Sequence, residues 1–317
     1  MLLQYLLHTK PHHLTMARRI MSLLPFAIFV MIALNSWGAN CSGDEAGALL
    51  AFKAELTGEG SKLLASWNDS TRFCGWEGVK CSRGRVVALS LPSYGLTGTL
   101  SPAIGNLTFL QTLNLSSNWL RGEVPETIGR LLRLHTLDLS YNKFAGTLPA
   151  NLSFCVSLQF LSLGSNLLHG RIPVELGNKL TSLQKLSLAN NSLIGPIPVS
   201  LANMSSLYYL DLATNHFEGQ IPPELGNIGS LQVLVLLENN LSGVLPYSLY
   251  NLSSLKTFQV QYNMLSGTIP ANIGDSFPSI EILSFASNQF SGYIRASLSN
   301  LSALTKLGVS VNSFSGK

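Results

Sequence analysis

An asparagine recurs along this chain at an almost constant interval of 24 residues, with two intervals of 25. The positions are Asn118, Asn142, Asn166, Asn191, Asn215, Asn239, Asn263, Asn288 and Asn312. A single globular core needs no side chain at such an interval. A solenoid does, because each repeat forms one coil stacked on its neighbour. The interval therefore predicts a solenoid, and it favours a binding protein over a catalyst.

The residues before each asparagine follow a strand-like pattern. In the copy that starts at Leu134, Leu137 and Leu139 complete a set of leucines at its first, fourth and sixth places. Alternate side chains of a short strand would point inward in this pattern. Asn142 follows where the chain turns, and a buried turn leaves backbone N–H and C=O groups that need partners. An Asn amide offers two donors and an acceptor, so the stacked copies predict a continuous amide ladder.

The second half of each copy also repeats. Phe144 or its equivalent is expected to fill the interior, and Gly146 permits a tight bend of the backbone. A proline then restricts φ in the crossing segment, at Pro125, Pro149, Pro173, Pro198, Pro222, Pro246 and Pro270. A further apolar column is expected on the convex side, formed by Leu107, Leu131, Cys155, Leu180, Met204, Ile228, Leu252, Phe277 and Leu301.

The pattern closely resembles the plant-type leucine-rich repeat, whose family form is LxxLxLxxNxLxGxIPxxLGxLxx. Ten copies start at Val86, Leu110, Leu134, Leu158, Leu183, Leu207, Leu231, Leu255, Ile280 and Leu304. Two residues depart from it: Tyr94 stands at the first ladder position and Arg295 where the ninth repeat should have proline. The resemblance implies an α/β solenoid, a curved right-handed superhelix with a parallel sheet on its concave face and a helical N-terminal cap.

The segment 1–38 is expected to be a secretory signal, with residues 1–15 as a possible upstream extension. Arg18 and Arg19 would form its positive region, and residues 23–34 its apolar region. A signal anchor retained in the membrane is the alternative. Outside this segment 17 basic and 16 acidic residues remain. With no basic tract, we expect no nucleic-acid partner. No second apolar run is long enough to span a membrane.

Glycosylation sequons agree with an exported, extracellular or cell-surface protein. The sites expected to carry glycans are Asn68, Asn106, Asn151, Asn203, Asn251 and Asn300. Further sequons occur at Asn40, Asn114, Asn190 and Asn240. An Asn- and Ser-rich repeat also produces sequons by chance, so the motif alone does not establish modification.

Residues 39–85 are expected to cap the open end of the solenoid, whose apolar core would otherwise be exposed. Ser42 to Glu45 reads as a capping box, and the helix that follows would present Leu49, Phe52 and Leu56 on one side. The segment containing Trp67 and residues 73–81 resembles the N-terminal cap of plant leucine-rich-repeat receptors, which implies a Cys74–Cys81 disulfide. Cys155 falls in the apolar column and is read as a buried free thiol, which leaves Cys41 without an assigned partner.

No constellation for catalysis emerges. His135, His169 and His216 fall at unrelated repeat positions, and none accompanies a recognisable nucleophile motif. Phosphate-binding loops, kinase signatures and metal-ligand spacings are missing. We therefore expect neither enzymatic activity nor a metal or cofactor.

Function is then expected from the outward side chains of the concave strands, and repeats 6 to 8 are unusual there. Exposed aromatic and aliphatic groups beside polar ones are typical of binding hot spots. The predicted footprint comprises Phe160, Lys185, Tyr208, Tyr209, Asp211, Val233, Val235, Leu237, Glu238, Gln259, Gln261 and Tyr262. The alternative is that these apolar residues merely protect the strands beneath them.

The resemblance implies the ligand-binding ectodomain of a plant receptor kinase of the immune-receptor-like subfamily, with a peptide or protein ligand and a co-receptor. In that family a membrane span and a kinase follow, and neither is present here, so an association with the membrane would need a missing downstream span or a retained signal anchor. A secreted inhibitor similar to the polygalacturonase-inhibiting proteins is the second hypothesis. A soluble decoy or gene fragment is the third. Residues 86–317 would form about ten repeats, the last incomplete, and we expect fraying from about Ile280 onward.

Overall fold

The computed structural model describes residues 45–68 and 70–315. The chain divides into two compact units, residues 1–47 and 48–317, and residues 45–47 of the first unit are helical. The predicted signal segment, the sequon at Asn40, Cys41 and the start of the capping box at Ser42 lie outside the described residues. Within the described part, no helix is long and apolar enough to cross a membrane.

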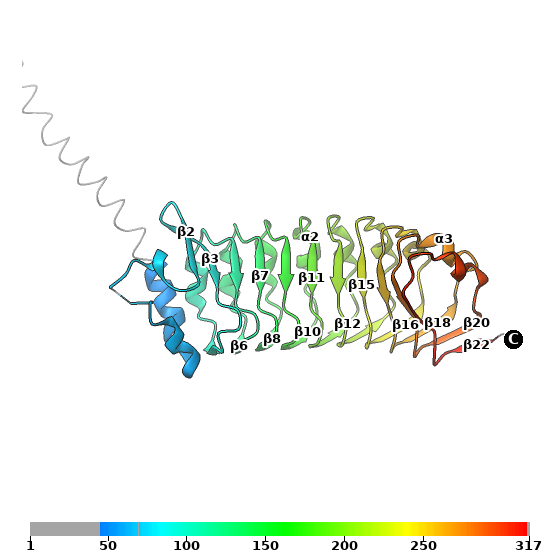
Figure 1. Ribbon diagram of the computed structural model, residues 1–317, viewed down its shortest axis with the longest axis horizontal. Coiled ribbons are helices and arrows are strands. Elements are labelled where there is room, and N and C mark those ends of the chain that lie inside the picture. Colours follow the sequence, from blue (N-terminus) through cyan, green and yellow to red (C-terminus); the bar gives the residue numbers. More distant parts are fainter. Residues whose placement is uncertain (1–44, 69, 316–317) are drawn as a thin grey trace, which may run out of the picture. The chain divides into compact units, whose positions relative to one another are not determined.

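The second unit is built from two sheets whose strands follow one another along the chain (Figure 1). Its first sheet contains β2 (Val79–Ser82), β3 (Arg85–Ser90), β5 (Thr112–Asn114), β7 (Thr136–Asp138), β9 (Phe160–Ser162), β11 (Lys185–Ser187), β13 (Tyr209–Asp211), β15 (Val233–Val235), β17 (Thr257–Gln259), β19 (Ile282–Ser284) and β21 (Lys306–Gly308). The strands pair in parallel, except that β2 is antiparallel to β3.

The second sheet was not predicted. It consists of β1 (Leu56–Thr57), β4 (Thr97–Thr99), β6 (Trp119–Glu123), β8 (Lys143–Thr147), β10 (Leu167–Gly170), β12 (Ser192–Gly195), β14 (His216–Gly219), β16 (Asn240–Val244), β18 (Met264–Thr268), β20 (Gln289–Tyr293) and β22 (Ser313–Ser315). These strands are also parallel, except where β1 meets β4. Gly146, expected at a bend, lies in β8 with φ 81°.

A short helix returns each coil from the second sheet to the first. In the repeats these helices are η3 (Pro102–Asn106), η4 (Glu126–Arg130), η5 (Ala150–Phe154), α2 (Val174–Lys179), η6 (Val199–Asn203), η7 (Pro223–Asn227), η8 (Tyr247–Asn251), α3 (Ile273–Ser276) and η9 (Ala296–Asn300). The residue after each one belongs to the predicted apolar column, and every member of that column is buried. The predicted α/β solenoid is confirmed.

The asparagine ladder forms as expected, and Asn215 illustrates it. Its Nδ2 donates to the carbonyls of Leu212 and Ala213 in its own coil, at 3.2 and 3.0 Å, and to Leu188 in the preceding coil at 3.0 Å. Its Oδ1 accepts the Leu193 N–H of the preceding coil at 3.0 Å. Each asparagine therefore joins two coils and satisfies groups that the turn removes from water.

This geometry explains both departures from the repeat. Asn118 reaches back to the Leu91 carbonyl and the Leu96 N–H, so the coil containing Tyr94 needs no asparagine of its own. Arg295 has φ −82° and ψ 135°, in the same extended region as the prolines it replaces, and its Nε donates to the Ile269 carbonyl at 3.0 Å. The position therefore requires an extended backbone rather than a proline ring.

The cap begins, within the second unit, with helical residues 48–54. Leu49 and Phe52 are fully buried as predicted. The placement of Leu56 on this helix was wrong, because the helix has ended and Leu56 pairs with Gly98 across β1 and β4. η1 (Glu59–Leu64) and η2 (Phe73–Gly75) follow. Trp67 stacks on Trp76 with ring centroids 5.5 Å apart.

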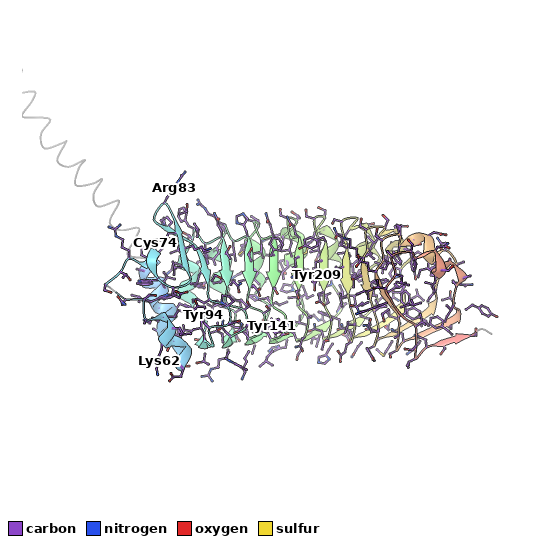
Figure 2. All side chains as sticks on the ribbon, viewed as in Figure 1. Lys62, Cys74, Arg83, Tyr94, Tyr141 and Tyr209 are labelled. Atoms are coloured by element: carbon purple, nitrogen blue, oxygen red, sulfur yellow. A yellow bond between two sulfur atoms is a disulfide. The ribbon has the colours of Figure 1, made fainter. Side chains whose placement is uncertain are left out.

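The two cysteine predictions that fall on described residues are confirmed. Cys74, labelled in Figure 2, forms a disulfide with Cys81 that ties η2 to β2. Cys155 is a buried free thiol, and its Sγ donates to the Ile128 carbonyl of the preceding coil at 3.3 Å. Burial raises the pKa of the Cys155 thiol to about 12. This thiol therefore behaves as an apolar packing group.

Candidate functional site

Two columns of side chains point outward from the first sheet, because the middle residue of each three-residue strand faces the core. The strand register aligns Phe160, Lys185, Tyr209 and Val233 in one column. Asp211, Val235 and Gln259 align in the other. Neighbouring parallel strands lie about 4.8 Å apart, so side chains in one column can contact one another.

Lys185, Tyr209 and Asp211 form a connected group at the centre of these columns. The Lys185 ammonium lies 4.8 Å from the centre of the Tyr209 ring. The Tyr209 hydroxyl donates to Asp211 Oδ2 at 3.2 Å, and the Ala213 N–H donates to Oδ1 at 3.1 Å. Each side chain in the group is half-buried. The contacts hold the Tyr209 ring in one orientation before any ligand arrives.

Partial burial also changes the acidities of this group. It raises the pKa of Tyr209 to about 12, with the nearby Asp211 carboxylate as a second cause. Burial likewise raises the pKa of Asp211 above its ordinary value, although the Ala213 N–H, the Tyr209 hydroxyl and Lys185 oppose this shift. Tyr209 is therefore a neutral phenol at physiological pH, suited to packing and hydrogen bonding rather than to proton transfer.

A shallow hollow of about 280 Å³ lies beside this group. Its lining combines Lys185, Tyr209 and Asp211 with Asp138 and Tyr141 from an earlier coil. The remaining lining residues are small: Ser140, Ser162, Gly164, Ser165, Ser187 and Ala189. Two large rings separated by coils with small side chains leave this space. Figure 2 labels Tyr141 and Tyr209, which come from different coils.

A further column, which we call the αL column, lies at the corner where each coil leaves the first sheet. It consists of the residue before each ladder asparagine: Ser117, Tyr141, Ser165, Asn190, Thr214, Glu238, Tyr262, Ser287 and Val311. All have φ between 51° and 57°, a region that non-glycine residues rarely adopt. Backbone hydrogen bonds hold them there, as where the Glu238 N–H donates to the Gln261 carbonyl at 2.9 Å.

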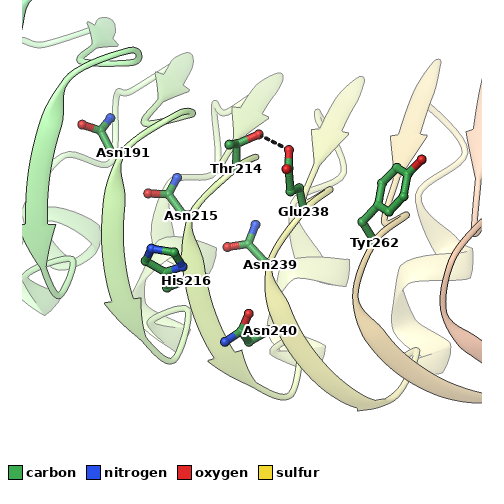
Figure 3. Close-up of a pocket in the computed structure, with 8 residues that line it drawn as sticks. All are labelled: Asn191, Thr214, Asn215, His216, Glu238, Asn239, Asn240 and Tyr262. Atoms are coloured by element: carbon green, nitrogen blue, oxygen red, sulfur yellow. Dashed lines mark hydrogen bonds between the residues drawn. The ribbon is translucent and has the colours of Figure 1, made fainter.

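A second hollow, of about 240 Å³, opens on this corner in repeats 5 to 8. Figure 3 shows Thr214, Glu238 and Tyr262 in consecutive coils, with His216 and Asn240 below them. Thr214 Oγ1 donates to Glu238 Oε2 at 2.9 Å. Ladder residues Asn191, Asn215 and Asn239 complete the lining. The Tyr262 side chain is 62% exposed.

The predicted footprint is therefore divided. Lys185, Tyr209 and Asp211 line the first hollow, and Glu238 and Tyr262 line the second. Neither hollow includes Phe160, Tyr208, Val233, Val235, Leu237, Gln259 or Gln261. The expectation of an exposed Val235 was wrong, since only 8% of it is exposed. Strand alternation gives the direction of a side chain but not its coverage by neighbours.

Sequence reasoning missed Tyr141, Thr214, His216 and Asn240 as lining residues. A signal was available, because Tyr141 and Tyr262 both stand immediately before a ladder asparagine. His216 and Asn240 both stand immediately after one. Comparison of these positions, in addition to the strand positions, would have found the corner.

The predicted glycosylation sites lie away from both hollows. Asn106, Asn203, Asn251 and Asn300 each end a short helix, at η3, η6, η8 and η9. Asn151 lies within η5, and Asn68 is an exposed residue of the cap. Glycans at these sites stay a prediction. Among the residues that the structure describes, no three His, Cys, Asp or Glu side chains come together as metal ligands.

Comparison with protein families gives two matches. Residues 42–82 match the family described as Leucine rich repeat N-terminal domain. Four segments, 109–131, 133–155, 182–204 and 206–228, match the family described as Leucine Rich Repeat.

Curated relatives match over short segments. The LRR receptor-like serine/threonine-protein kinase EFR of Arabidopsis thaliana is 51% identical over 71 residues, which are 22% of this chain and 7% of the relative. Receptor kinase-like protein Xa21 of Oryza sativa subsp. japonica is 48% identical over 82 residues, with 23% and 8% covered. The chain therefore matches less than a tenth of the length of either receptor.

Solved structures match over most of this chain. The Arabidopsis receptor kinase HAESA, in complex with the peptide hormone IDA and the co-receptor SERK1, has a TM-score of 0.78 and 35% identity, covering 85% of this chain and 46% of that one. A plant ice-binding protein has a TM-score of 0.78 and 29% identity, covering 87% and 88%. These matches show that the chain contains leucine-rich repeats and their N-terminal cap, and that it is similar over most of its length to the ectodomains of plant receptor kinases.

Proposed function

We propose that this chain is an extracellular ligand-recognition region of a plant receptor-like kinase, and that it binds a peptide or protein across the outer face of the first sheet. The observation that carries the proposal is the Lys185–Tyr209–Asp211 group. It fixes a large amphipathic ring beside a hollow, as binding hot spots do.

Relatives in the same fold support this class of ligand. HAESA was solved with a peptide hormone and a co-receptor, and PEPR1 was solved with AtPEP1. PEPR1 covers 85% of this chain with a TM-score of 0.69 and 32% identity. A co-receptor and a cell-surface location for this chain belong to the same proposal. Binding rather than catalysis is its expected role.

The test uses a peptide selected for this protein, because the natural ligand is unidentified. A random-peptide phage library is panned on the purified chain, and the tightest peptide is measured by calorimetry. The double variant Tyr209→Ala/Tyr262→Ala should weaken its binding by well over tenfold, since it removes both ring contacts. Tyr247→Ala is the matched control, because Tyr247 is 80% exposed on η8, away from the first sheet. Unchanged affinity in the double variant would place the site elsewhere.

A further inference from the structure

The coil segments around the hollow in repeats 5 to 8 carry carboxylates but no lysine or arginine. The coil segments around it are residues 189–198, 213–222, 237–246 and 261–270, and they contain no lysine or arginine. They contain two carboxylates, Glu218 and Glu238, and one histidine, His216. Of the two carboxylates only Glu238 lines the hollow. A cationic ligand group would therefore meet no lysine or arginine on these segments.

The Glu238 carboxylate can accept further hydrogen bonds from a ligand. Thr214 Oγ1 is the only hydrogen-bond donor to its carboxylate among the described residues, and it reaches Oε2. Oε1 has no donor within that part of the chain. Thr214 holds one oxygen of the carboxylate, and the αL backbone sets where the Glu238 side chain leaves the coil. A carboxylate oxygen held in place but without a donor favours a charge-assisted bond from a bound group.

Tyr262 supplies the second element. Its carbonyl accepts the Asn239 N–H at 3.1 Å, which fixes its backbone against the Glu238 coil. The ring stands in the column next to Glu238 (Figure 3). The same chain already pairs cations with rings elsewhere: Lys185 lies over Tyr209, and Lys143 lies 4.9 Å from the centre of the Trp119 ring. Among the residues that the structure describes, no lysine or arginine lies over the Tyr262 ring.

We propose that the hollow lined by Thr214, His216, Glu238, Asn240 and Tyr262 binds a cationic group of the ligand, an ammonium or a guanidinium. The group would contact the Tyr262 ring and donate to Glu238 Oε1. Asn240 offers an amide for the remaining donors. The inference deepens the proposed function, because it assigns a positive charge to one position of the peptide that crosses the first sheet.

The test uses small probes, so it does not depend on finding the natural ligand. Saturation-transfer NMR is recorded with N-acetyl-lysine amide, N-acetyl-arginine amide and glycinamide. These separate a lysine side chain, an arginine side chain and a free N-terminal amine. N-acetyl-glutamine amide is the neutral probe. At least one cationic probe should give a signal that falls threefold or more in Glu238→Gln and in Tyr262→Leu, while the neutral probe gives none.

Two matched control variants test whether the probe signals come from the hollow. Glu218→Gln removes a carboxylate of the same flank that does not line the hollow, and Tyr293→Leu removes a ring that is 61% exposed in another column. Both should leave the signals unchanged. Equal signals from the neutral probe, or cationic signals that survive Glu238→Gln, would overturn the subsite. Tyr209→Ala tests the proposed function separately, through the selected peptide. If this variant loses peptide binding while no cationic probe gives a signal with the unchanged protein, the subsite alone is overturned.

Discussion

Two corners of the solenoid have the same backbone and opposite charge. The N-terminal corner, in repeats 2 to 4, presents Trp119, Arg121, Tyr141, Lys143 and Arg171, with Glu123 as its one carboxylate. The C-terminal corner, in repeats 6 to 8, presents Thr214, His216, Glu238, Asn240 and Tyr262. Tyr141 and Tyr262 occupy equivalent positions in their repeats, and both belong to the αL column, with φ of 55° and 57°.

The two corners differ in the source of the cation that contacts an aromatic ring. At the N-terminal corner Lys143 already lies over the Trp119 ring. At the C-terminal corner a ring and a carboxylate stand together, and no lysine or arginine lies in the surrounding segments. The first corner pairs a ring with a cation of its own chain, whereas we propose that the second takes its cation from the ligand. The scaffold therefore sets where side chains stand, and single residues beside the ladder set what they bind.

The largest expected effect is on the free energy of unfolding, and it comes from the asparagine ladder that both corners share. Asn142→Ala and Asn263→Ala each remove the amide beneath one corner. Each leaves a buried N–H, of Leu120 or Leu241, and carbonyls without their donor. An unsatisfied buried group costs about 1–3 kcal/mol, so each variant should lose about 3 kcal/mol of unfolding free energy. Urea denaturation followed by circular dichroism measures this.

Asn227→Ala is the control for these two variants, because Asn227 is exposed at the end of η7 and makes no side-chain hydrogen bond within the described residues. It should change the unfolding free energy by less than about 0.5 kcal/mol. The two ladder variants should agree closely. A loss at one corner but not at the other would show that the corners do not share one scaffold.

The repeat could be predicted from sequence because packing constrains the same position in every coil. Ladder asparagines, the apolar column and the Cys74–Cys81 disulfide were all recognisable, the last through family resemblance. The second sheet was missed for a physical reason. In Trp119–Glu123 only Leu120 faces the core, so the segment lacks the apolar content by which a strand is usually recognised. Gly122 supported the reading of a bend.

The candidate site was only partly predictable. Outward columns follow from strand alternation, which correctly gave Tyr209, Asp211 and Lys185 as neighbours. The hollow beside them depends on small residues such as Ser162 and Gly164, whose importance comes only from the large rings on either side. The corner depends on backbone geometry at Glu238 and Tyr262, and alternation does not describe a turn.

A smaller effect separates two aspartates at equivalent positions. Asp211 has a raised pKa in the folded protein, so its ionisation opposes folding. Its contribution to the free energy of unfolding is therefore fully present below its ordinary pKa of 3.8, and it is lost as the pH rises through the raised pKa. Asp211→Asn removes this cost and keeps an oxygen for the Ala213 N–H. The melting temperature should therefore exceed that of the unchanged protein at pH 7, and the gain should shrink below pH 4.

Asp138→Asn is the matched substitution near the N-terminal corner, and its expected sign is opposite. Asp138 Oδ1 accepts the Ser140 N–H at 3.0 Å and the Ser140 hydroxyl at 2.6 Å. A neutral amide oxygen is a weaker acceptor than a carboxylate, so the melting temperature at pH 7 should fall. Thermal unfolding of both variants at the two pH values decides the matter. A lower melting temperature for Asp211→Asn at pH 7 would contradict the assigned cost.

The smallest effect tests the corners' difference directly. Lys143→Met keeps the apolar stem but removes the charge over Trp119, and should cost about 0.5 kcal/mol, the usual size for an exposed cation–π pair. Trp119 fluorescence should change with it. The reciprocal change, Asn240→Lys, introduces an ammonium at the same repeat position in the C-terminal corner, in the lining of the hollow. It should therefore reduce the saturation-transfer signal of the cationic probes, because a built-in cation competes for the same carboxylate. An undiminished signal would mean that the two corners differ in shape as well as in charge.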